Sequence, residues 1–167
     1  MKTIVVMRHS KAEHTGPTDF DRTLSERGHV DATVVGEWLA ALEITPDLAL
    51  VSGATRTVQT WEDVAAGAGW DLDLAEYDEA LYEAGTTTAL DLIRDTSEEI
   101  GCLMVIGHNP TIANLAELLD DGAGEQSDEL VLGYPTSAVA VFSYDGEWSD
   151  LDEAGATVVA FRPGARV

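Results

Sequence analysis

The sequence predicts an α/β protein, a three-layer α/β/α sandwich with helices on both faces of a mainly parallel sheet. Short runs of consecutive apolar residues recur along the chain, as in strands that are buried on both faces. Between them lie segments with apolar residues at three- and four-residue steps, a spacing typical of helices with one buried face. Because strands alternate with helices over most of the length, we expect a parallel sheet.

The first strand and the first helix are separated by a polar segment. Residues 3–7 form the expected strand. Thr23 and Glu26 have the spacing of a capping box, which predicts a helix over about residues 24–42. The expected buried face of this helix consists of Val30, Val34, Trp38, Leu39 and Leu42.

The next apolar run, residues 48–51, predicts a second strand. A helix over about residues 55–66 follows and is ended by Gly67 or Gly69, because glycine commonly terminates helices. The remaining expected elements are an edge strand at 72–76, a helix at 86–94, a strand at 103–106, a helix from Pro110 to about 119, a loop at 120–129, and strands at 138–144 and 157–161. No repeat or linker divides the chain, so we expect residues 1–167 to form a single domain.

The composition excludes several classes of protein. The 167 residues include 9 Lys and Arg against 31 Asp and Glu, a net charge of −22. Binding to nucleic acid or to an anionic membrane needs clustered surplus cations, so neither partner is expected. A single cysteine excludes an intrachain disulfide, and no apolar span is long enough to cross a membrane. These features predict a cytoplasmic protein.

Arginine and histidine side chains follow three of the expected strands. Arg8 and His9 end the first strand, Arg56 lies one turn beyond the second, and His108 follows the third buried strand. Because ligands bind at the carboxyl ends of parallel strands, we expect these side chains to meet. Guanidinium groups bind phosphate in bidentate fashion, and imidazole serves as a nucleophile or a proton carrier. Their convergence predicts an anion site, and Arg22 in the loop after the first strand is a further candidate.

Four motifs in this order resemble those of the histidine phosphatase superfamily, whose fold is the phosphoglycerate-mutase-like one. They are Arg8-His9, Asp21-Arg22-Thr23-Leu24-Ser25-x-x-Gly28, Ser52-x-x-x-Arg56-x-x-x-Thr60, and Gly107-His108. Their order, spacing and the short chain are most similar to the short phosphohistidine phosphatases of the SixA type. The resemblance covers about residues 2–119. Ser10 departs from it, because the family signature most often has Gly there, and we expect the small hydroxyl to fit.

The resemblance implies a two-step phosphoryl transfer that uses no metal and no other cofactor. His9 attacks phosphorus and forms a phosphohistidine, which water then hydrolyses. Cationic and imidazole groups hold the phosphoryl oxygens and stabilise their charge. The expected phosphate-binding residues are Arg8, Arg22, Arg56, His108 and Asn109. For Arg22, an ion pair with Asp19 or Asp21 is the structural alternative.

The general acid is the least defined part of the predicted site. Larger members of the family use a carboxylate, and Asp78, Glu79 and Glu83 lie in the corresponding stretch. Of these, Glu79 is the preferred candidate. Expelling an alkoxide from a phosphate ester needs a proton donor, whereas a phosphohistidine has a better leaving group. A chain without a clear acid therefore favours phosphohistidine as the substrate.

Three functions are compatible with these residues. The leading one is a phosphatase that acts on the phosphohistidine of a protein or on a small phosphate. The second is a phosphoglycerate-mutase-type phosphoryl transfer, although mutases of the family are longer and carry insertions that enclose the substrate. The third is a non-catalytic module that binds phosphate or a phosphoprotein. The sequence predicts no particular oligomeric state.

Overall fold

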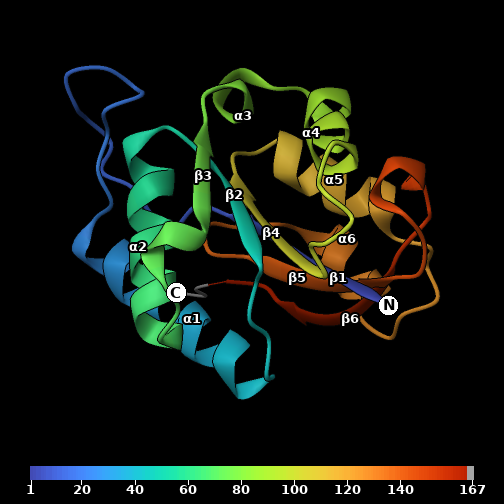
Figure 1. The fold of residues 1–167 in the computed structure, drawn as a ribbon. Helices are drawn as coiled ribbons and strands as arrows, with labels where there is room; N and C mark the ends of the chain where they lie inside the picture. The colour runs from blue at the N-terminus through green and yellow to red at the C-terminus, as the bar shows by residue number, and fades with distance from the viewer. Residues whose placement is uncertain (165–167) are drawn as a thin grey trace.

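The computed structural model describes residues 1–164 and has a six-stranded sheet between two layers of helices (Figure 1). The strands are β1 (Lys2–Arg8), β2 (Leu48–Ser52), β3 (Ala75–Asp78), β4 (Cys102–Gly107), β5 (Val139–Tyr144) and β6 (Thr157–Arg162). The helices are α1 (Glu26–Ala41), α2 (Thr55–Ala68), α3 (Ala80–Glu83), α4 (Thr86–Arg94), α5 (Thr111–Leu119) and α6 (Ser127–Leu132), with 3-10 turns η1 (Leu72–Leu74) and η2 (Trp148–Asp150). Within residues 1–164, none of these helices combines the length and the apolar character needed to cross a membrane.

The sheet is mainly parallel, which confirms the predicted fold class. Its strand order is β3-β2-β4-β1-β5-β6. The pairs β1–β4, β2–β4 and β2–β3 are parallel, whereas β5 runs antiparallel to both β1 and β6. The carboxyl ends of β1, β2 and β4 therefore open on the same edge of the sheet. This edge brings together the residues that follow those three strands.

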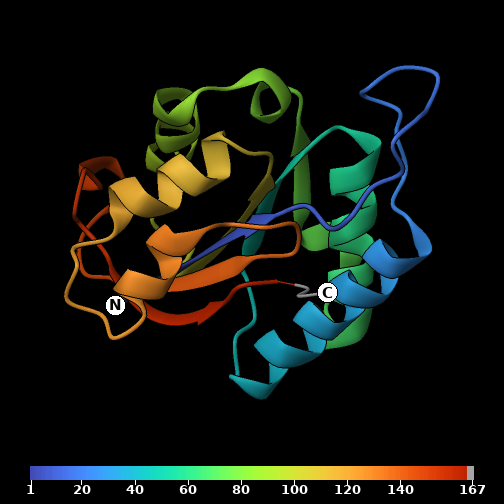
Figure 2. The same ribbon diagram turned by 180° about the vertical axis from the view of Figure 1, so that it is seen from behind.

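The two faces of the sheet bury separate hydrophobic cores. Val5 and Met7 of β1 pack in the core that includes α1 and α2, whereas Ile4 and Val6 pack in the core that includes α4, α5 and α6. Successive side chains alternate because the side-chain period of a strand is two residues. Figures 1 and 2 show α1 and α2 together on one side of the sheet, with the other helices on the opposite side. Burial on both faces explains the continuous apolar runs in the sequence.

Helices α1 and α2 pack closely through two glycines. A Cβ atom on Gly36 of α1 would lie 2.1 Å from the Val64 carbonyl oxygen. A Cβ atom on Gly67 of α2 would lie 2.2 Å from the Thr33 carbonyl oxygen. Gly67 therefore lies inside α2, and Gly69, in the left-handed conformation with φ of 76°, ends the helix.

This close contact corrects the predicted buried face of α1. Val30 is 59% exposed, and Val34 and Leu42 are exposed as well. The buried hydrophobic side chains of α1 are those of Ala32, Val35 and Leu39. The helix turns its glycine-containing face toward α2, because small residues let the two backbones approach. Val30 and Val34 therefore lie outside the contact, whereas the predicted Leu39 is buried.

The start of α1 also differs from the prediction. Ser25, and not Thr23, is the N-cap, and its hydroxyl accepts a hydrogen bond from the Gly28 N–H at 3.1 Å. The Thr23 carbonyl accepts from the Glu13 N–H at 2.8 Å, which keeps the chain before Ser25 extended. The helix therefore begins two residues later than the capping-box spacing predicts.

Three further boundaries are corrected. The strand expected at residues 72–76 starts only at β3, because the Asp71 carboxylate caps the turn η1 by accepting from the Asp73 N–H. Helix α6 replaces the end of the loop expected at residues 120–129, and the two acidic residues in its first turn suit the positive end of the helix dipole. Pro110 directly precedes α5 and is not its first residue.

Candidate active site

Three strand ends bring the predicted histidines and arginines together. His9 follows β1, Arg56 lies in the first turn of α2 after β2, and His108 follows β4. The His9 N–H donates to the Gly107 carbonyl, and the His9 carbonyl accepts from the Ser137 N–H, each at 3.0 Å. The ring centroids of His9 and His108 are 5.3 Å apart. The edge of the sheet thus makes two imidazoles neighbours.

The His9 ring is oriented by the residue that follows it. Nδ1 lies 2.7 Å from the Ser10 carbonyl oxygen. Because a carbonyl only accepts, Nδ1 carries the proton and Nε2 holds the lone pair that a nucleophile needs. Burial, together with the positive charges of Arg56 and Arg8, lowers the pKa of His9 to about 4 against the opposing effect of the Ser10 hydrogen bond. His9 is therefore neutral at physiological pH.

His108 is held by a serine at the end of β2. Its Nε2 lies 2.8 Å from the Ser52 hydroxyl oxygen. Burial lowers the pKa of His108 to about 3, with contributions from His9 and Arg56, so this ring is also neutral. When the Ser52 hydroxyl donates to Nε2, the ring proton of His108 is on Nδ1. This Nδ1 is buried and has no hydrogen-bond partner among the described residues.

Unpaired donors gather in this cluster. Five buried side-chain polar atoms within residues 1–164 have no hydrogen-bond partner, and three of them are Arg8 Nε, Arg56 Nε and His108 Nδ1. Burial and the nearby Arg56 charge lower the pKa of Arg8, because two guanidinium groups lie close together. Buried donors are normally paired, and an oxyanion satisfies several charged donors at once. The cluster can therefore bind a phosphoryl group.

Asp19 connects two of the arginines. Arg56 donates to the Asp19 carbonyl at 2.8 Å and to its carboxylate at 3.2 Å. Arg22 donates to the other carboxylate oxygen at 3.0 Å, and the Tyr82 hydroxyl also donates to this carboxylate. The Tyr82 hydrogen bond, followed by the two arginines, lowers the pKa of Asp19 to about 2. Tyr82 also lies edge-on to the His108 ring, with centroids 5.4 Å apart. An ionised Asp19 thus holds Arg56 beside the histidines.

Arg22 and Asn109 lie near the cluster but are already engaged. Arg22 forms the ion pair with Asp19, which confirms the structural alternative, and also lines the same pocket as His9. The amide nitrogen of Asn109 donates to the Tyr134 carbonyl at 2.8 Å, and its oxygen accepts from a backbone N–H in α5 at 3.2 Å. Contact of these two residues with phosphate stays a prediction.

Glu79 lies beside Tyr82 and forms no hydrogen bond with either histidine among the described residues. Its side chain is exposed and lines a pocket of about 320 Å³ with Phe20, Tyr82 and Glu83. Tyr82 in turn contacts the His108 ring. The Glu79 carboxylate forms no hydrogen bond or ion pair with the residues that the structure describes. Its role as general acid stays a prediction.

Ser10 ties the loop after His9 to helix α2. Its side chain is fully buried, with the hydroxyl oxygen 2.6 Å from that of Ser137, so the hydroxyl fits as predicted. The Ser10 N–H donates to the Thr60 hydroxyl at 3.0 Å, and this hydroxyl donates to the Arg56 carbonyl at 2.7 Å. The hydrogen bonds fix the His9 loop relative to the helix that carries Arg56.

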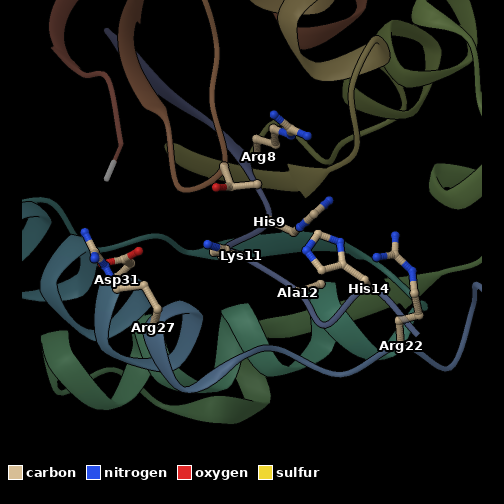
Figure 3. A pocket seen from close by; sticks show the side chains of 9 residues that line it. Arg8, His9, Lys11, Ala12, His14, Arg22, Arg27 and Asp31 are labelled. Carbon is tan, nitrogen blue, oxygen red and sulfur yellow. The ribbon is translucent and has the colours of Figure 1, made fainter. Parts of the chain in front are cut away.

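A pocket of about 380 Å³ opens beside His9 (Figure 3). Its lining residues are Arg8, His9, Lys11, Ala12, His14, Arg22, Arg27, Asp31 and Thr136. The sequence motifs include Arg8, His9 and Arg22, but they assign no role to Lys11 or Arg27. The sequence predicts Asp19 as a partner of Arg22, which the structure shows. It gives no signal for the contact of Asp19 with Arg56 or for the role of Tyr82.

Comparison with known proteins agrees with this geometry. The model of the histidine phosphatase superfamily (branch 1) matches residues 4–99. The chain belongs to this superfamily. Protein Rv1276c of Mycobacterium tuberculosis (strain H37Rv) is 35% identical over 159 residues, which cover 93% of this chain and 98% of the relative. Phosphohistidine phosphatase SixA of Escherichia coli (strain K12) is 27% identical over 147 residues, 85% of each chain.

Solved structures of histidine phosphatases have the same fold. The SixA-type protein from Nakamurella multipartitia has a TM-score of 0.84 at 30% identity, covering 96% of this chain and 95% of that chain. The protein histidine phosphatase SixA in complex with tungstate has a TM-score of 0.78 at 22% identity, covering 95% of each chain. With the family match, these similarities identify a histidine-dependent phosphatase with the phosphoglycerate-mutase-like fold, and they do not favour a mutase.

Proposed function

We propose that this histidine phosphatase removes the phosphoryl group from a phosphohistidine of a protein, with His9 as the nucleophile. The observation that carries the proposal is the pair of buried, neutral imidazoles of His9 and His108, 5.3 Å apart, with Arg8 and Arg56 beside them. The name of the Escherichia coli relative, phosphohistidine phosphatase, supports this substrate class. A cytoplasmic location is part of the proposal.

The first step transfers the phosphoryl group to the protein. Nε2 of His9 attacks phosphorus in line with the P–N bond of the substrate, so the Nε2–P bond forms as the substrate imidazole leaves. Arg8, Arg56 and His108 bind the phosphoryl oxygens through donors that have no other acceptor. These donors stabilise the negative charge of the transition state. In the second step water attacks the same phosphorus, which releases inorganic phosphate and restores His9.

The leaving group favours a phosphohistidine over a phosphate ester. A phosphohistidine that is protonated on its second ring nitrogen leaves as neutral imidazole, whose conjugate acid has an ordinary pKa near 6.5. A serine ester leaves as an alkoxide and needs a proton donor. Asp19 is ionised and held by Arg56 and Tyr82, so it has no proton to give. Among the described residues, no carboxylate forms a hydrogen bond with His9 or His108.

A comparison of substrates tests the proposal. Wild type and His9→Ala are assayed for phosphate release from a protein carrying phosphohistidine and from a phosphoserine peptide. We expect the wild type to hydrolyse the phosphohistidine and His9→Ala to be slower by at least about three orders of magnitude. Isomerisation of phosphoglycerate without free phosphate would indicate a mutase instead. Phosphate binding without hydrolysis of any donor would indicate a binding module.

A further inference from the structure

We infer that the pocket beside His9 is a docking site for acidic side chains that flank the phosphohistidine of the substrate. The inference rests on the proposed function, because a protein substrate holds Asp and Glu side chains at fixed positions around the phosphorylated residue. Lys11 and Arg27, together called the flanking cations, line this pocket next to Arg8, His9 and Arg22. Figure 3 shows Lys11 between the end of β1 and the helix that carries Arg27.

The charge of the pocket is opposite to that of the chain. It contains four of the nine Lys and Arg residues but only one of the 31 Asp and Glu residues. An acidic segment is therefore repelled by most of the protein and attracted here, which orients an approaching substrate. Arg8 lies in the cluster that can bind the phosphoryl group, whereas Lys11 and Arg27 do not belong to that cluster. These two residues are available for a second anionic group.

Backbone contacts fix Lys11 against the first turn of α1. The Lys11 carbonyl accepts from the N–H of Ser25 at 2.9 Å and from the Ser25 hydroxyl at 3.1 Å. A Cβ atom on Gly28 would lie 2.0 Å from the same carbonyl oxygen, so only glycine permits this approach. Lys11 and Arg27 are thus carried by two segments with a fixed relative position.

The ammonium group of Lys11 and the two terminal amino groups of Arg27 are available to a ligand. Arg27 donates through Nε to Asp31 at 2.9 Å, and Asp31 is buried. This ion pair uses neither terminal amino group of Arg27, and these groups have no acceptor within residues 1–164. The ammonium group of Lys11 is exposed and likewise forms no ion pair in the described part of the chain. Cationic groups with donors left over for a ligand are notable in a chain with so many carboxylates.

The size and chemistry of the pocket suit carboxylate side chains. A volume of about 380 Å³ is at the small end of ligand sites and is sufficient for one or two acidic side chains. An ammonium and a guanidinium group both form charge-assisted hydrogen bonds with carboxylates. On a protein substrate, Asp and Glu are the anions available next to the phosphohistidine. The flanking cations therefore select substrates with acidic neighbours.

Two matched peptides test this inference. Both carry one phosphohistidine, and they differ only in having Glu or Gln at the flanking positions. The ratio of kcat/KM values, acidic over neutral peptide, is measured for the wild type, Lys11→Gln, Arg27→Gln and Lys2→Gln. Lys2→Gln is the control, because it removes the same charge from the opposite end of β1, about 20 Å from the site.

We expect the wild type to prefer the acidic peptide at least about tenfold at an ionic strength of about 0.1 M, where the Debye length is about 10 Å. Lys11→Gln and Arg27→Gln each lower this preference about three- to fivefold, as loss of one partly exposed charge pair predicts. Lys2→Gln leaves the preference unchanged, because the distance exceeds the Debye length. Equal rates for the two peptides in the wild type would overturn the inference. An equal effect of Lys2→Gln and Lys11→Gln would also overturn it, in favour of a long-range effect of net charge.

Failure of the proposed function gives a different result. If neither peptide is hydrolysed, the proposal of a phosphohistidine phosphatase activity is wrong. Binding of the unphosphorylated acidic and neutral peptides to the same four proteins is measured by calorimetry in parallel. Tighter binding of the acidic peptide that weakens in Lys11→Gln supports the docking site independently of turnover. No difference in binding between the two peptides refutes it.

Discussion

The lowered pKa of His9 predicts an unusual pH dependence of activity. Free His9 must be neutral to attack phosphorus, and protonation on Nε2 removes its lone pair. Burial, with Arg56 and Arg8, lowers its pKa from the ordinary value to about 4. Because kcat/KM reports the ionisation of the free enzyme, its decrease at acid pH should be centred near pH 4. An unperturbed histidine would give a decrease near pH 6.5.

The structure sets the size of this effect. A shift from 6.5 to about 4 corresponds to about 3 kcal/mol in favour of the neutral ring. At pH 5.5 a group with a pKa near 4 is about 97% neutral, whereas a group with a pKa of 6.5 is only about 9% neutral. At this pH the protein should therefore retain nearly all of its kcat/KM, about tenfold more than an ordinary histidine would allow.

The same shift affects stability, and the two effects have to be separated. Unfolded histidines bind protons below about pH 6.5, while folded His9 and His108 stay neutral down to about pH 4 and about pH 3. The unfolded state therefore binds more protons between these values, and the free energy of unfolding decreases as the pH falls through this window. Circular dichroism at each pH identifies the range in which the protein stays folded.

The assay measures kcat/KM from pH 4 to pH 8 at constant ionic strength, with the ionisation of the substrate measured separately by phosphorus NMR. Nitrogen NMR of labelled histidine follows the His9 ring directly. A midpoint near pH 6.5 in both measurements, with the protein folded throughout, would refute the reasoning. It would show that the His9 ring is solvated, contrary to its 7% exposure.

Three substitutions give further expected outcomes. Arg56→Lys keeps the charge but loses the planar pair of donors, so kcat/KM should fall about 100-fold in steady-state assays; a fall of less than about threefold contradicts a direct phosphoryl contact. Tyr82→Phe removes the hydroxyl that holds Asp19, which should lower kcat/KM about three- to tenfold; unchanged kinetics would show that this hydrogen bond does not position the arginine. Gly36→Ala forces α1 and α2 apart and should reduce the free energy of unfolding by about 2 kcal/mol or more in urea titrations. Gly85→Ala, where a Cβ has open space, is its control and should cost no more than about 1 kcal/mol, the usual preference of an N-cap for glycine over alanine.

The sequence predicts the strands well because their burial is a local property of the chain. Runs such as residues 4–7 and 103–106 are apolar at every position, since both faces of the sheet are covered. The buried face of α1 is different, because it depends on the contact of Gly36 with α2. A glycine contributes nothing to hydrophobic periodicity, so Val30 and Val34 predict a face that the structure exposes. That face is defined only once both helices are in place.

The site likewise has residues whose position the sequence predicts and residues whose position it does not. The convergence of His9 and His108 follows from strand order, because residues after parallel strands meet at one edge. The contact between Asp19 and Tyr82 depends instead on the path of a long loop and on the short helix α3, for which the sequence has no periodic signal. Lys11 and Arg27 are likewise brought together by hydrogen bonds from Ser25 to the Lys11 carbonyl, a contact between distant segments that the motif containing Ser25 does not reveal.

Trapping the phosphoenzyme tests the central claim most directly. Wild type and His9→Ala are incubated with a phosphoryl donor, quenched in base, and digested, and the added phosphate is located by mass spectrometry. The account predicts phosphate on His9 in the wild type and no phosphorylated histidine in His9→Ala. Phosphate on another residue, or hydrolysis that continues in His9→Ala at the wild-type rate, would contradict His9 as the nucleophile.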